Sequence, residues 1–226
     1  NLILKLNASQ KENLALIQHT LTIQEDERQR LSQELHDELG QSLTAIKIMS
    51  ATIAKADKIK NPLVFQSSRS IIEICDNLIK VVRSMMQQLH PLILTELGLK
   101  EALYDLVDNW KTRSQTLHID IDYDDRLTIN RKNIEIHLFR IVQEALTNIF
   151  RHANASYAKI TLRSQEGKLL LEIEDDGIGC THEDMNNGFG LLSMKDRVRS
   201  LNGEFKTYSS PNNGLRILVI FPYNLV

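Results

Sequence analysis

Apolar residues recur at steps of three or four along the N-terminal part of the chain, which is the spacing of one face of a helix. The first run continues to about Asp57, and Asn61-Pro62 then marks a break, because proline disfavours helical geometry in the preceding residue. A second run ends at Pro91. The pattern therefore predicts two long helices joined as a hairpin. The first run is Leu31, Leu35, Leu39, Leu43, Ile46, Ser50 and Ile53, and the second is Ile71, Ile74, Cys75, Leu78, Val81, Val82, Met85 and Leu89.

Two helices alone cannot cover two apolar stripes. We therefore expect two copies of the chain to pair in a four-helix bundle around a two-fold axis. Ahead of the hairpin, Leu14, Ile17 and Leu21 have the spacing of a short heptad seam. We interpret residues 1–23 as a signalling helix or coiled coil, although a plain helical linker fits equally well, and residues 24–90 as the dimerising hairpin.

Beyond Pro91 the spacing of apolar residues alternates between helical and strand periods. Helices and strands are mixed without a strict βαβ repeat, so residues 91–226 are predicted to form an α+β domain with helices on one face of a sheet. The predicted helices are one opened near Gly98, Asn133–Arg151 and about Leu191–Leu201, and the predicted strands are His118–Tyr123, Lys159–Arg163, Leu169–Glu174, Glu204–Tyr208 and Leu215–Phe221.

Composition narrows the class of protein only slightly. The 226 residues are 42% hydrophobic and 25% charged with a net charge of -2, so bulk charge gives no indication of direct nucleic-acid binding. Cys75 and Cys180 lack metal-type spacing and favour a reducing, cytosolic setting. No apolar run approaches the roughly 20 residues of a membrane span. Because the chain begins with Asn1, we expect it to be a fragment of a longer protein.

The first candidate for chemistry is a polar group on the flank of the first helix. His36 follows the apolar Leu35, Asp37 is its neighbour, and Gln41 lies one turn after Asp37 on the same face. Gly40 removes the side chain that would stand over the imidazole, at a cost of about 1 kcal/mol relative to alanine. A nucleophile needs such access, and a neighbouring carboxylate commonly activates it. The competing interpretation is a solvated surface histidine.

The second candidate lies on the polar face of the helix Asn133–Arg151. Glu144, Asn148 and His152 are spaced four apart, and Arg151 lies beside them. The amide oxygen of Asn148 suits a divalent cation such as Mg²⁺, which is usually shared with substrate phosphates. Taken alone, this face is better explained as solvated surface.

Two glycine clusters flank a short polar loop and strengthen that prediction. Asp175 opens the first cluster, which contains Gly177 and Gly179 and follows a strand. Glycines permit close backbone approach, and a carboxylate beside them can accept a hydrogen bond from an exocyclic amine such as that of adenine. Gly188 and Gly190 precede a helix, where backbone N–H groups favour phosphate.

Together these motifs resemble a known family. Glu144–Asn148 with Arg151-His152-Ala153 is similar to the N box of the ATPases that include gyrase, Hsp90 and the histidine kinases. The two glycine clusters resemble the glycine boxes of the same family. Glu34 to Gln41 resembles the phosphoacceptor box of the histidine-kinase subfamily that includes the bacterial nitrate and hexose-phosphate sensors, and His90 to Leu99 is similar to its linker.

The resemblance implies roles for individual residues. His36 would be phosphorylated, Asp37 would act as the base that polarises the imidazole, and Gln41 would position water for dephosphorylation of a partner. Asn148 would hold Mg²⁺ with support from Glu144. The other implied nucleotide contacts are Arg151 and His152 for phosphate or ribose, Asp175 rather than Asp176 for the adenine amine, Gly177 and Gly179 for the pocket, Gly188 and Gly190 for the phosphates, and Cys180–Asn187 for the lid.

Two departures from the family pattern are visible. Arg151 stands where many kinases have lysine, which preserves the charge, and no phenylalanine-rich box is evident. The resemblance implies a multidomain chain in which a dimeric helical hairpin precedes an α/β-sandwich ATP-binding domain. It implies ATP and Mg²⁺ as cofactors, a homodimer, and transfer of phosphate to a response regulator with a DNA-binding output domain.

The parent protein would lie in the inner membrane through a missing N-terminal sensor region, with this part facing the cytosol. Two rival interpretations belong to other classes. One is an ATPase clamp of the gyrase and Hsp90 kind without histidine phosphorylation, against which the His36 hairpin argues. The other is a dimerising scaffold with a degenerate kinase, against which the intact Asn148, Asp175 and glycines argue.

Overall fold

The computed structural model describes residues 2–57, 61–89, 91–114, 116–129, 131–181 and 188–222. The chain divides into two compact units. One unit comprises residues 22–92, and the other comprises residues 1–21 and 93–226.

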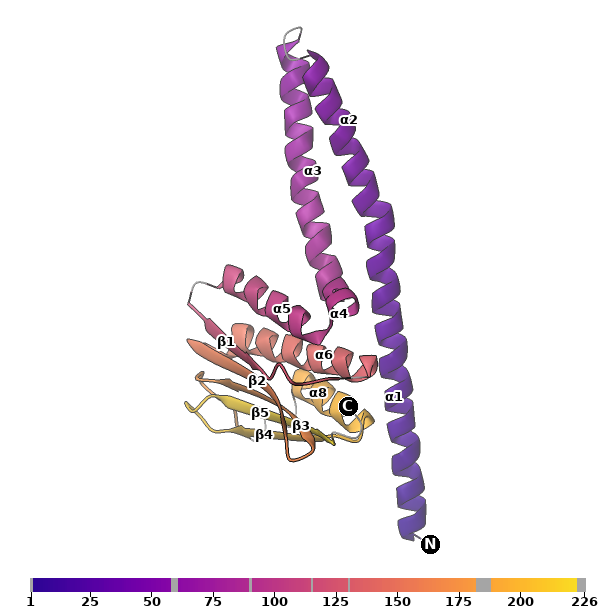
Figure 1. The fold of residues 1–226 in the computed structure, drawn as a ribbon, viewed down its shortest axis with the longest axis vertical. Coiled ribbons are helices and arrows are strands. Elements are labelled where there is room, and N and C mark those ends of the chain that lie inside the picture. The colour runs from indigo at the N-terminus through magenta and orange to yellow at the C-terminus, as the bar shows by residue number, and fades with distance from the viewer. Residues whose placement is uncertain are drawn as a thin grey trace. The chain divides into compact units, whose positions relative to one another are not determined.

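The first unit is built around an antiparallel helical hairpin (Figure 1). Its helices are the part of α1 (Leu2–Glu34) from residue 22 onward, a π-helical turn η1 (Leu35–Gly40), α2 (Gln41–Asp57) and α3 (Pro62–Leu89). The predicted end near Asp57 and the predicted break at Asn61-Pro62 are confirmed. The Asn61 side-chain oxygen accepts hydrogen bonds from the backbone N–H groups of Leu63 (3.1 Å) and Val64 (3.4 Å), which caps the N-terminus of α3.

The hairpin buries small and polar residues between its own helices and leaves many of its large apolar residues exposed. Ser50 and Ala54 of α2 and Ser68, Cys75 and Val82 of α3 are buried. The apolar run predicted for α3 therefore divides into two faces, because Ile71, Ile74, Leu78, Val81 and Met85 are exposed, as are Leu39, Ile46 and Ile53 of the first run. We call these eight residues the exposed stripe.

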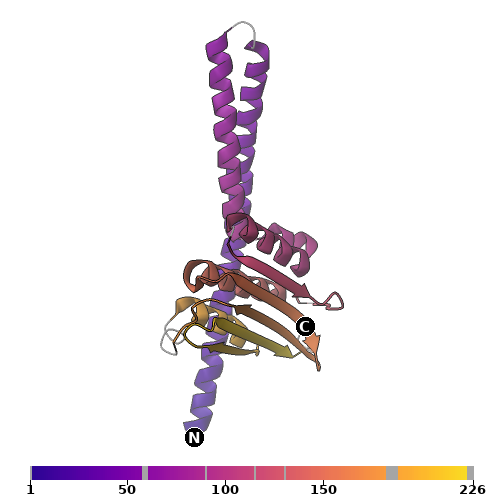
Figure 2. The same ribbon diagram turned by 90° about the vertical axis from the view of Figure 1, so that its left-hand side faces the viewer.

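The second unit is a five-stranded sheet with helices on one face (Figure 2). The sheet order is β1-β2-β3-β5-β4, in which only β1 and β2 are parallel. The short helix α4 (Leu92–Leu97), which the sequence reading missed, precedes α5 at Gly98. The remaining elements are α5 (Leu99–Arg113), β1 (His118–Tyr123), α6 (Lys132–Asn148), a π-helical turn η2 (Ile149–Ala153), β2 (Tyr157–Gln165), β3 (Lys168–Asp175), α8 (Phe189–Ser200), β4 (Glu204–Ser209) and β5 (Leu215–Pro222).

One continuous core lies between the sheet and its helices. Alternate residues of the strands face this core, as the period of two requires. Strand β3 contributes Leu169, Leu171 and Ile173, and the same alternation places Asp175 on the helix-covered face at the end of the strand. The core is completed by residues of the helices, including Leu103 and Val107 of α5, Leu138, Ile141, Val142 and Leu146 of α6, and Met194 and Val198 of α8.

Candidate functional site

The phosphoacceptor-like segment forms a π-helical turn rather than the continuous α-helix that the sequence predicts. Within this turn, His36 and Asp37 are exposed, with the side chain of His36 60% accessible. The Asp37 carboxylate lies 3.2 Å from His36 Nδ1 and also accepts a 3.4 Å hydrogen bond from Gln41 Nε2. The structure therefore brings the three predicted residues together, because His36 and Gln41 both contact the same carboxylate oxygen of Asp37.

This arrangement favours one tautomer of the imidazole. A carboxylate can only accept, so its contact with Nδ1 places the proton on that nitrogen and leaves the lone pair of Nε2 outward. The site is open above the ring, because a Cβ added at Gly40 would meet only the Leu35 carbonyl oxygen, at an ordinary 3.9 Å. The turn can thus present an unprotonated nitrogen to a second molecule.

In the other unit, the predicted metal-binding residues face the second glycine cluster. Gly190, in the first turn of α8, packs directly on α6. A Cβ at Gly190 would lie 2.3 Å from a Glu144 carboxylate oxygen and 3.0 Å from Asn148 Nδ2. Only glycine fits this contact without displacing those side chains. The sequence positions of Glu144, Asn148 and Gly190 are far apart, but the fold makes them neighbours.

The helix that carries this group differs from the prediction in two respects. Regular α-helix ends at Asn148, and Arg151 and His152 lie exposed in the π turn η2. A π turn holds more residues than an α-helical turn, so the predicted stacking of His152 over Asn148 at a spacing of four is lost. Arg140, a charged residue of the same helix, is buried and donates to the Gln143 side-chain oxygen at 2.8 Å.

The two acidic residues of the first glycine cluster have different environments. Asp175 is half-buried and accepts a hydrogen bond from the Gly177 N–H at 2.9 Å. Burial raises the pKa of the Asp175 carboxyl, while hydrogen bonds from the backbone N–H groups of Gly177 and Leu215 oppose that shift and the charge of Asp176 adds to it. A carboxylate on the core side of the sheet, only partly satisfied by backbone, remains able to accept another hydrogen bond.

Asp176, by contrast, is engaged in holding the start of β2. Its carboxylate accepts hydrogen bonds from the backbone N–H groups of Ser156 and Tyr157, both at 2.8 Å, and from the Ser156 hydroxyl at 2.6 Å. These bonds, the hydroxyl first, keep the pKa of the Asp176 carboxyl below its ordinary value. This geometry supports the choice of Asp175 over Asp176 as the residue left to contact a ligand.

Both glycines of the first cluster stand where a side chain would collide with backbone. A Cβ at Gly177 would lie 2.3 Å from the Ala153 carbonyl oxygen at the end of η2. Gly179 has φ +65, and a Cβ there would lie 2.2 Å from the Ser210 carbonyl oxygen. The cluster is therefore packed between the end of the helix that carries Asn148 and the turn that joins β4 to β5.

That turn is the part of the site that sequence reasoning missed. Gly214 has φ +64, and a Cβ there would lie 1.8 Å from the Asp175 carbonyl oxygen. Its backbone N–H donates to the Gly177 carbonyl at 2.8 Å, and the Asn212 N–H donates to the Ile178 carbonyl at 2.7 Å. The Asn212-Asn213-Gly214 run is a turn signal in the sequence, but nothing in it indicates that the turn packs against the acidic cluster.

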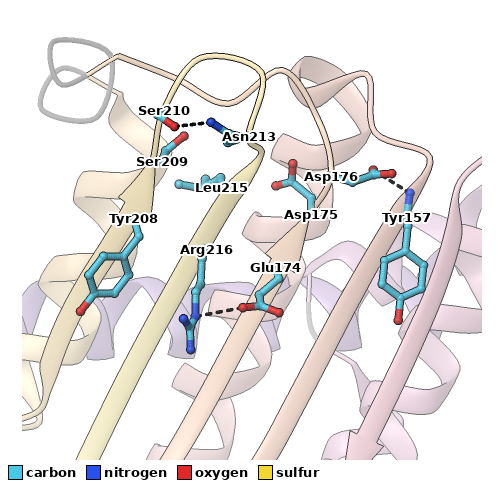
Figure 3. Close-up of a pocket in the computed structure, with 10 residues that line it drawn as sticks. All are labelled: Tyr157, Glu174, Asp175, Asp176, Tyr208, Ser209, Ser210, Asn213, Leu215 and Arg216. Atoms are coloured by element: carbon cyan, nitrogen blue, oxygen red, sulfur yellow. Dashed lines mark hydrogen bonds and ion pairs between the residues drawn. The ribbon is translucent and has the colours of Figure 1, made fainter.

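An open cavity of about 530 Å³ lies beside this cluster on the helix-free face of the sheet (Figure 3). The Tyr208 and Tyr157 side chains flank a central Arg216–Glu174 ion pair with a 2.9 Å contact. The cavity is lined by the β strands and the β4–β5 turn, with no residue from α6 or α8. Asp175, at the end of β3, is among the residues that line the cavity, whereas Asn148 is not.

Some expected features lie outside the part of the chain that the structure describes. Most of the predicted lid, residues 182–187, belongs there, as does His90 of the predicted linker. Among the described residues, no group of three or more histidine, cysteine, aspartate or glutamate side chains is arranged for a metal ion. Asn148 and Glu144 fit a cation that takes its remaining ligands from phosphates and water. No helix in the same residues is both long and apolar enough to span a membrane.

Comparison with known proteins identifies both halves of the chain. Residues 27–94 match a family model described as histidine kinase. Residues 133–225 match one described as histidine kinase-, DNA gyrase B-, and HSP90-like ATPase. Among solved structures, the histidine kinase domain from the Erythrobacter litoralis EL346 blue-light activated histidine kinase has a TM-score of 0.52 at 15% identity, covering 81% of this chain and 95% of that chain. This likeness supports the fold.

Curated relatives are similar over most of this chain. The sensor histidine kinase LiaS of Bacillus subtilis is 34% identical over 198 residues, which are 87% of this chain and 54% of LiaS. The sensor protein VraS of Staphylococcus aureus is 35% identical over 205 residues, 88% of this chain and 56% of VraS. The signal transduction histidine-protein kinase/phosphatase UhpB of Salmonella typhimurium is 32% identical over 228 residues, 98% of this chain and 45% of UhpB. The chain thus spans about half the length of these relatives.

Proposed function

This chain belongs to the histidine kinases, and on that premise we propose that it is the catalytic core of a two-component sensor kinase that phosphorylates its own His36. The observation that carries the proposal is the pairing of two sites in one chain. One is an exposed histidine whose Nδ1 contacts a carboxylate at 3.2 Å. The other is an ATPase-type cluster in which Gly190 packs on Glu144 and Asn148.

The hairpin geometry supports a definite chemical role for each residue. Asp37 accepts a hydrogen bond from Nδ1–H, so the proton stays on Nδ1 and the lone pair of Nε2 is the nucleophile. In the proposed transfer, a bond forms between Nε2 and the γ-phosphorus of ATP while the bond from that phosphorus to the bridging oxygen breaks, and ADP leaves. The ring becomes positively charged as Nε2 reacts, and Asp37 stabilises that charge and takes up the Nδ1 proton.

In the ATPase unit, we assign Asp175 to the exocyclic amine of adenine, because it is the acidic residue of the cluster with remaining acceptor capacity. Asn148 would hold Mg²⁺ with Glu144 beside it, and the ion would neutralise developing charge on the triphosphate. Gly177 and Gly179 shape the base pocket, and Gly188 and Gly190 precede and open α8, whose N-terminal N–H groups suit phosphate. Arg151 and His152 are exposed cationic or polar groups for phosphate or ribose.

A second activity is proposed for Gln41, which contacts the same Asp37 oxygen as His36. An amide offers both a donor and an acceptor, so Gln41 can hold a water molecule in line with a phosphoryl group. We propose that it assists removal of phosphate from the response regulator. The relative UhpB carries the name kinase/phosphatase, which is in keeping with two opposed activities on one helix.

The exposed stripe supports a homodimer, with residues 24–90 as the dimerising unit, residues 91–226 as the ATP-binding unit and residues 1–23 as a signalling helix. Eight large apolar side chains of the hairpin face away from its own seam. A second copy would cover them in a four-helix bundle.

The partner that receives the phosphate is proposed to be an aspartate of a response regulator with a DNA-binding output domain. We further propose that the parent protein is membrane-anchored through an N-terminal sensor region, with this core in the cytosol. Phosphotransfer from the labelled core to candidate regulators tests the first proposal, and fractionation of the full-length protein tests the second. A label that fails to leave His36 for any regulator would contradict the partner.

The central proposal is tested by incubating the chain with γ-labelled ATP and Mg²⁺. We expect label on the protein that is lost in acid and retained in base, as for a phosphorylated histidine. His36→Gln should bind ATP normally and take up no label. Label found only as free phosphate, with none on the protein, would favour an ATPase clamp instead. Label of normal stoichiometry on His36→Gln would place the phosphate elsewhere.

A further inference from the structure

One peptide group connects a serine on β4 to the acidic residue proposed to contact adenine. The hydroxyl of Ser209 donates to the Gly214 carbonyl oxygen at 2.6 Å and accepts from the Cys180 N–H at 2.9 Å. The next N–H along the chain, that of Leu215, donates to Asp175. In the sheet, β5 lies between β4 and β3, so Leu215 stands between Ser209 and Asp175 (Figure 3).

The Gly214 carbonyl and the Leu215 N–H belong to the same peptide unit, which is planar and moves as one body. Ser209 therefore holds one end of a rigid group whose other end holds Asp175. Hydrogen bonds in such a chain polarise one another, so a donor on the carbonyl strengthens the donation by the N–H. The Asp175 carboxylate is oriented through this peptide from a residue that is not itself in contact with it.

The surroundings of this peptide keep it from adjusting freely. Gly214 has φ +64 and approaches the Asp175 backbone so closely that a Cβ would lie 1.8 Å from the carbonyl oxygen. Its N–H is bonded to the Gly177 carbonyl at 2.8 Å. The peptide is thus fixed on its N-terminal side by backbone, and its carbonyl oxygen is held by the Ser209 hydroxyl at 2.6 Å.

We propose that Ser209 is a positioning residue for base selectivity, which fixes the Asp175 carboxylate toward the exocyclic amine of adenine through the Gly214–Leu215 peptide. This inference rests on the proposed function, in which Asp175 contacts that amine. Loss of the hydroxyl removes the hydrogen-bond partners of the Gly214 carbonyl and the Cys180 N–H that Ser209 supplies. Asp175 then becomes less well oriented, and the affinity falls for ligands that bind to its carboxylate.

The experiment compares binding of ATP and inosine triphosphate, which carries a carbonyl oxygen in place of the amine. Dissociation constants are measured on the whole chain for wild type, Ser209→Ala, Ser209→Thr and Ser210→Ala. Ser210 is the matched control, because its exposed hydroxyl accepts from the Asn213 side chain at 2.8 Å. In Ser209→Ala we expect ATP affinity to fall about fivefold and inosine triphosphate affinity to stay within about twofold.

The conservative variant separates positioning from a merely structural role. Ser209→Thr keeps the hydroxyl and should restore the wild-type preference for ATP, and Ser210→Ala should not alter it. In phosphorylation of His36, Ser209→Ala should raise the KM for ATP while kcat stays close to wild type. If Ser209→Ala does not fold, Ser209→Cys is used, whose weaker thiol donor should reduce the preference in the same direction but by less.

Four outcomes would overturn the proposal. Equal losses for the two nucleotides in Ser209→Ala would mean a general structural role, and so would failure of Ser209→Thr to restore the preference. Wild-type affinities for both nucleotides in Ser209→Ala would mean no role. If wild type itself does not prefer ATP over inosine triphosphate, the adenine assignment of Asp175 fails and the role of Ser209 fails with it. Covalent labelling of His36 would still stand in that case.

Discussion

The two units of this chain bury their apolar residues in different ways. In the ATPase unit, large aliphatic side chains of the sheet and its helices meet in one closed core, and Leu103, Leu138 and Val219 are fully buried. In the hairpin, the residues buried between the helices include Ser50, Ser68 and Cys75, while the exposed stripe carries larger apolar side chains. One unit is complete within a single chain, and the other has its larger apolar face directed outward.

The chemistry follows the same division. The residues proposed to bind nucleotide lie in close contact with glycines, as Glu144 does with Gly190 and Asp175 with Gly214. His36 lies on an exposed turn and is organised by a single carboxylate. Close packing therefore suits the proposed nucleotide site, and exposure suits the residue proposed to meet both ATP and a partner protein.

The comparison predicts that the hairpin needs a second copy to cover its apolar residues, whereas the ATPase unit does not. Ile74→Gln in the exposed stripe removes one apolar side chain from each copy, so the dimer should weaken by on the order of 10² to 10⁴-fold. Ile74 is 58% exposed, and Ile48, which is 61% exposed but lies outside the stripe on α2, provides a matched control. Analytical ultracentrifugation gives the mass of each variant, and ATP affinity should not change in either.

A wild-type chain that is monomeric at micromolar concentration would contradict the bundle. Equal dimer dissociation constants for Ile74→Gln and Ile48→Gln would show that the exposed stripe is not the interface.

The reverse test damages the ATPase unit and leaves the hairpin intact. Asn148→Asp places a further negative charge beside Glu144 and the triphosphate and removes the amide donor, so labelling of His36 should fall about 100-fold. The mass of the dimer should not change. Asn154→Asp adds the same charge at an exposed position just after η2 and serves as the control. Labelling of Asn148→Asp within a few-fold of wild type would remove the metal role from Asn148.

Within the hairpin, two neighbours of His36 should separate the forward and reverse activities. Gln41→Ala should slow dephosphorylation of a previously phosphorylated regulator on the order of tenfold, because a water molecule loses its orientation. Phosphorylation of His36 should be nearly unaffected. Gln33→Ala removes another exposed glutamine of the same helical segment and is the control.

Asp37→Ala should instead impair the forward reaction, because an alanine cannot accept the Nδ1 proton. Equal rates of regulator dephosphorylation by wild type and Gln41→Ala would remove the special role of Gln41 without affecting the kinase assignment.

The smallest expected effect is a pH dependence confined to the ATPase unit. Burial raises the pKa of the Asp175 carboxyl, so this group protonates at a higher pH than an ordinary aspartate as the solution is acidified. Only the ionised form accepts the adenine amine with both oxygens. ATP affinity should therefore fall a few-fold as pH drops through this raised pKa, whereas affinity for inosine triphosphate should not.

The raised pKa of Asp175 affects folding stability in the opposite direction from ATP affinity. Between the ordinary and the raised pKa, the folded chain binds more protons than the unfolded chain, so this carboxyl stabilises the fold less as pH rises through that window. Asp175→Asn should abolish the pH dependence of ATP preference. A preference that falls identically in wild type and Asp175→Asn would mean that another group titrates.

Most of the fold was predictable because its signals are periodic. The strands of the ATPase unit and the break at Asn61-Pro62 follow directly from alternation and from proline geometry. The division of α3 into two faces was not predictable, because Cys75 and Ile74 are both apolar and adjacent in sequence. Only packing against α2 determines which of them is buried.

The parts of the site that depend on side-chain functional groups were predictable from the sequence. The parts that depend on backbone groups were not. Asp175 and Asn148 are visible in the sequence through their functional groups and their glycine context. Gly214 and Ser209 act through a peptide group that lies beside Asp175 only after β5 pairs with β3 and β4. The sequence did not predict the π turns at Leu35–Gly40 and Ile149–Ala153, because their residues are ordinary helix formers.

The π turn at His36 also determines where the hairpin can tolerate deletion of one residue. A π-helical turn contains about one residue more than an α-helical turn, so a one-residue deletion inside Leu35–Gly40 can close it to an α-helix. The buried positions on either side would then stay nearly in phase. A deletion in the middle of α2 would instead rotate every later side chain of that helix by about 100°. Among related chains, one-residue insertions and deletions should therefore concentrate at the turn that carries His36, the proposed phosphoacceptor.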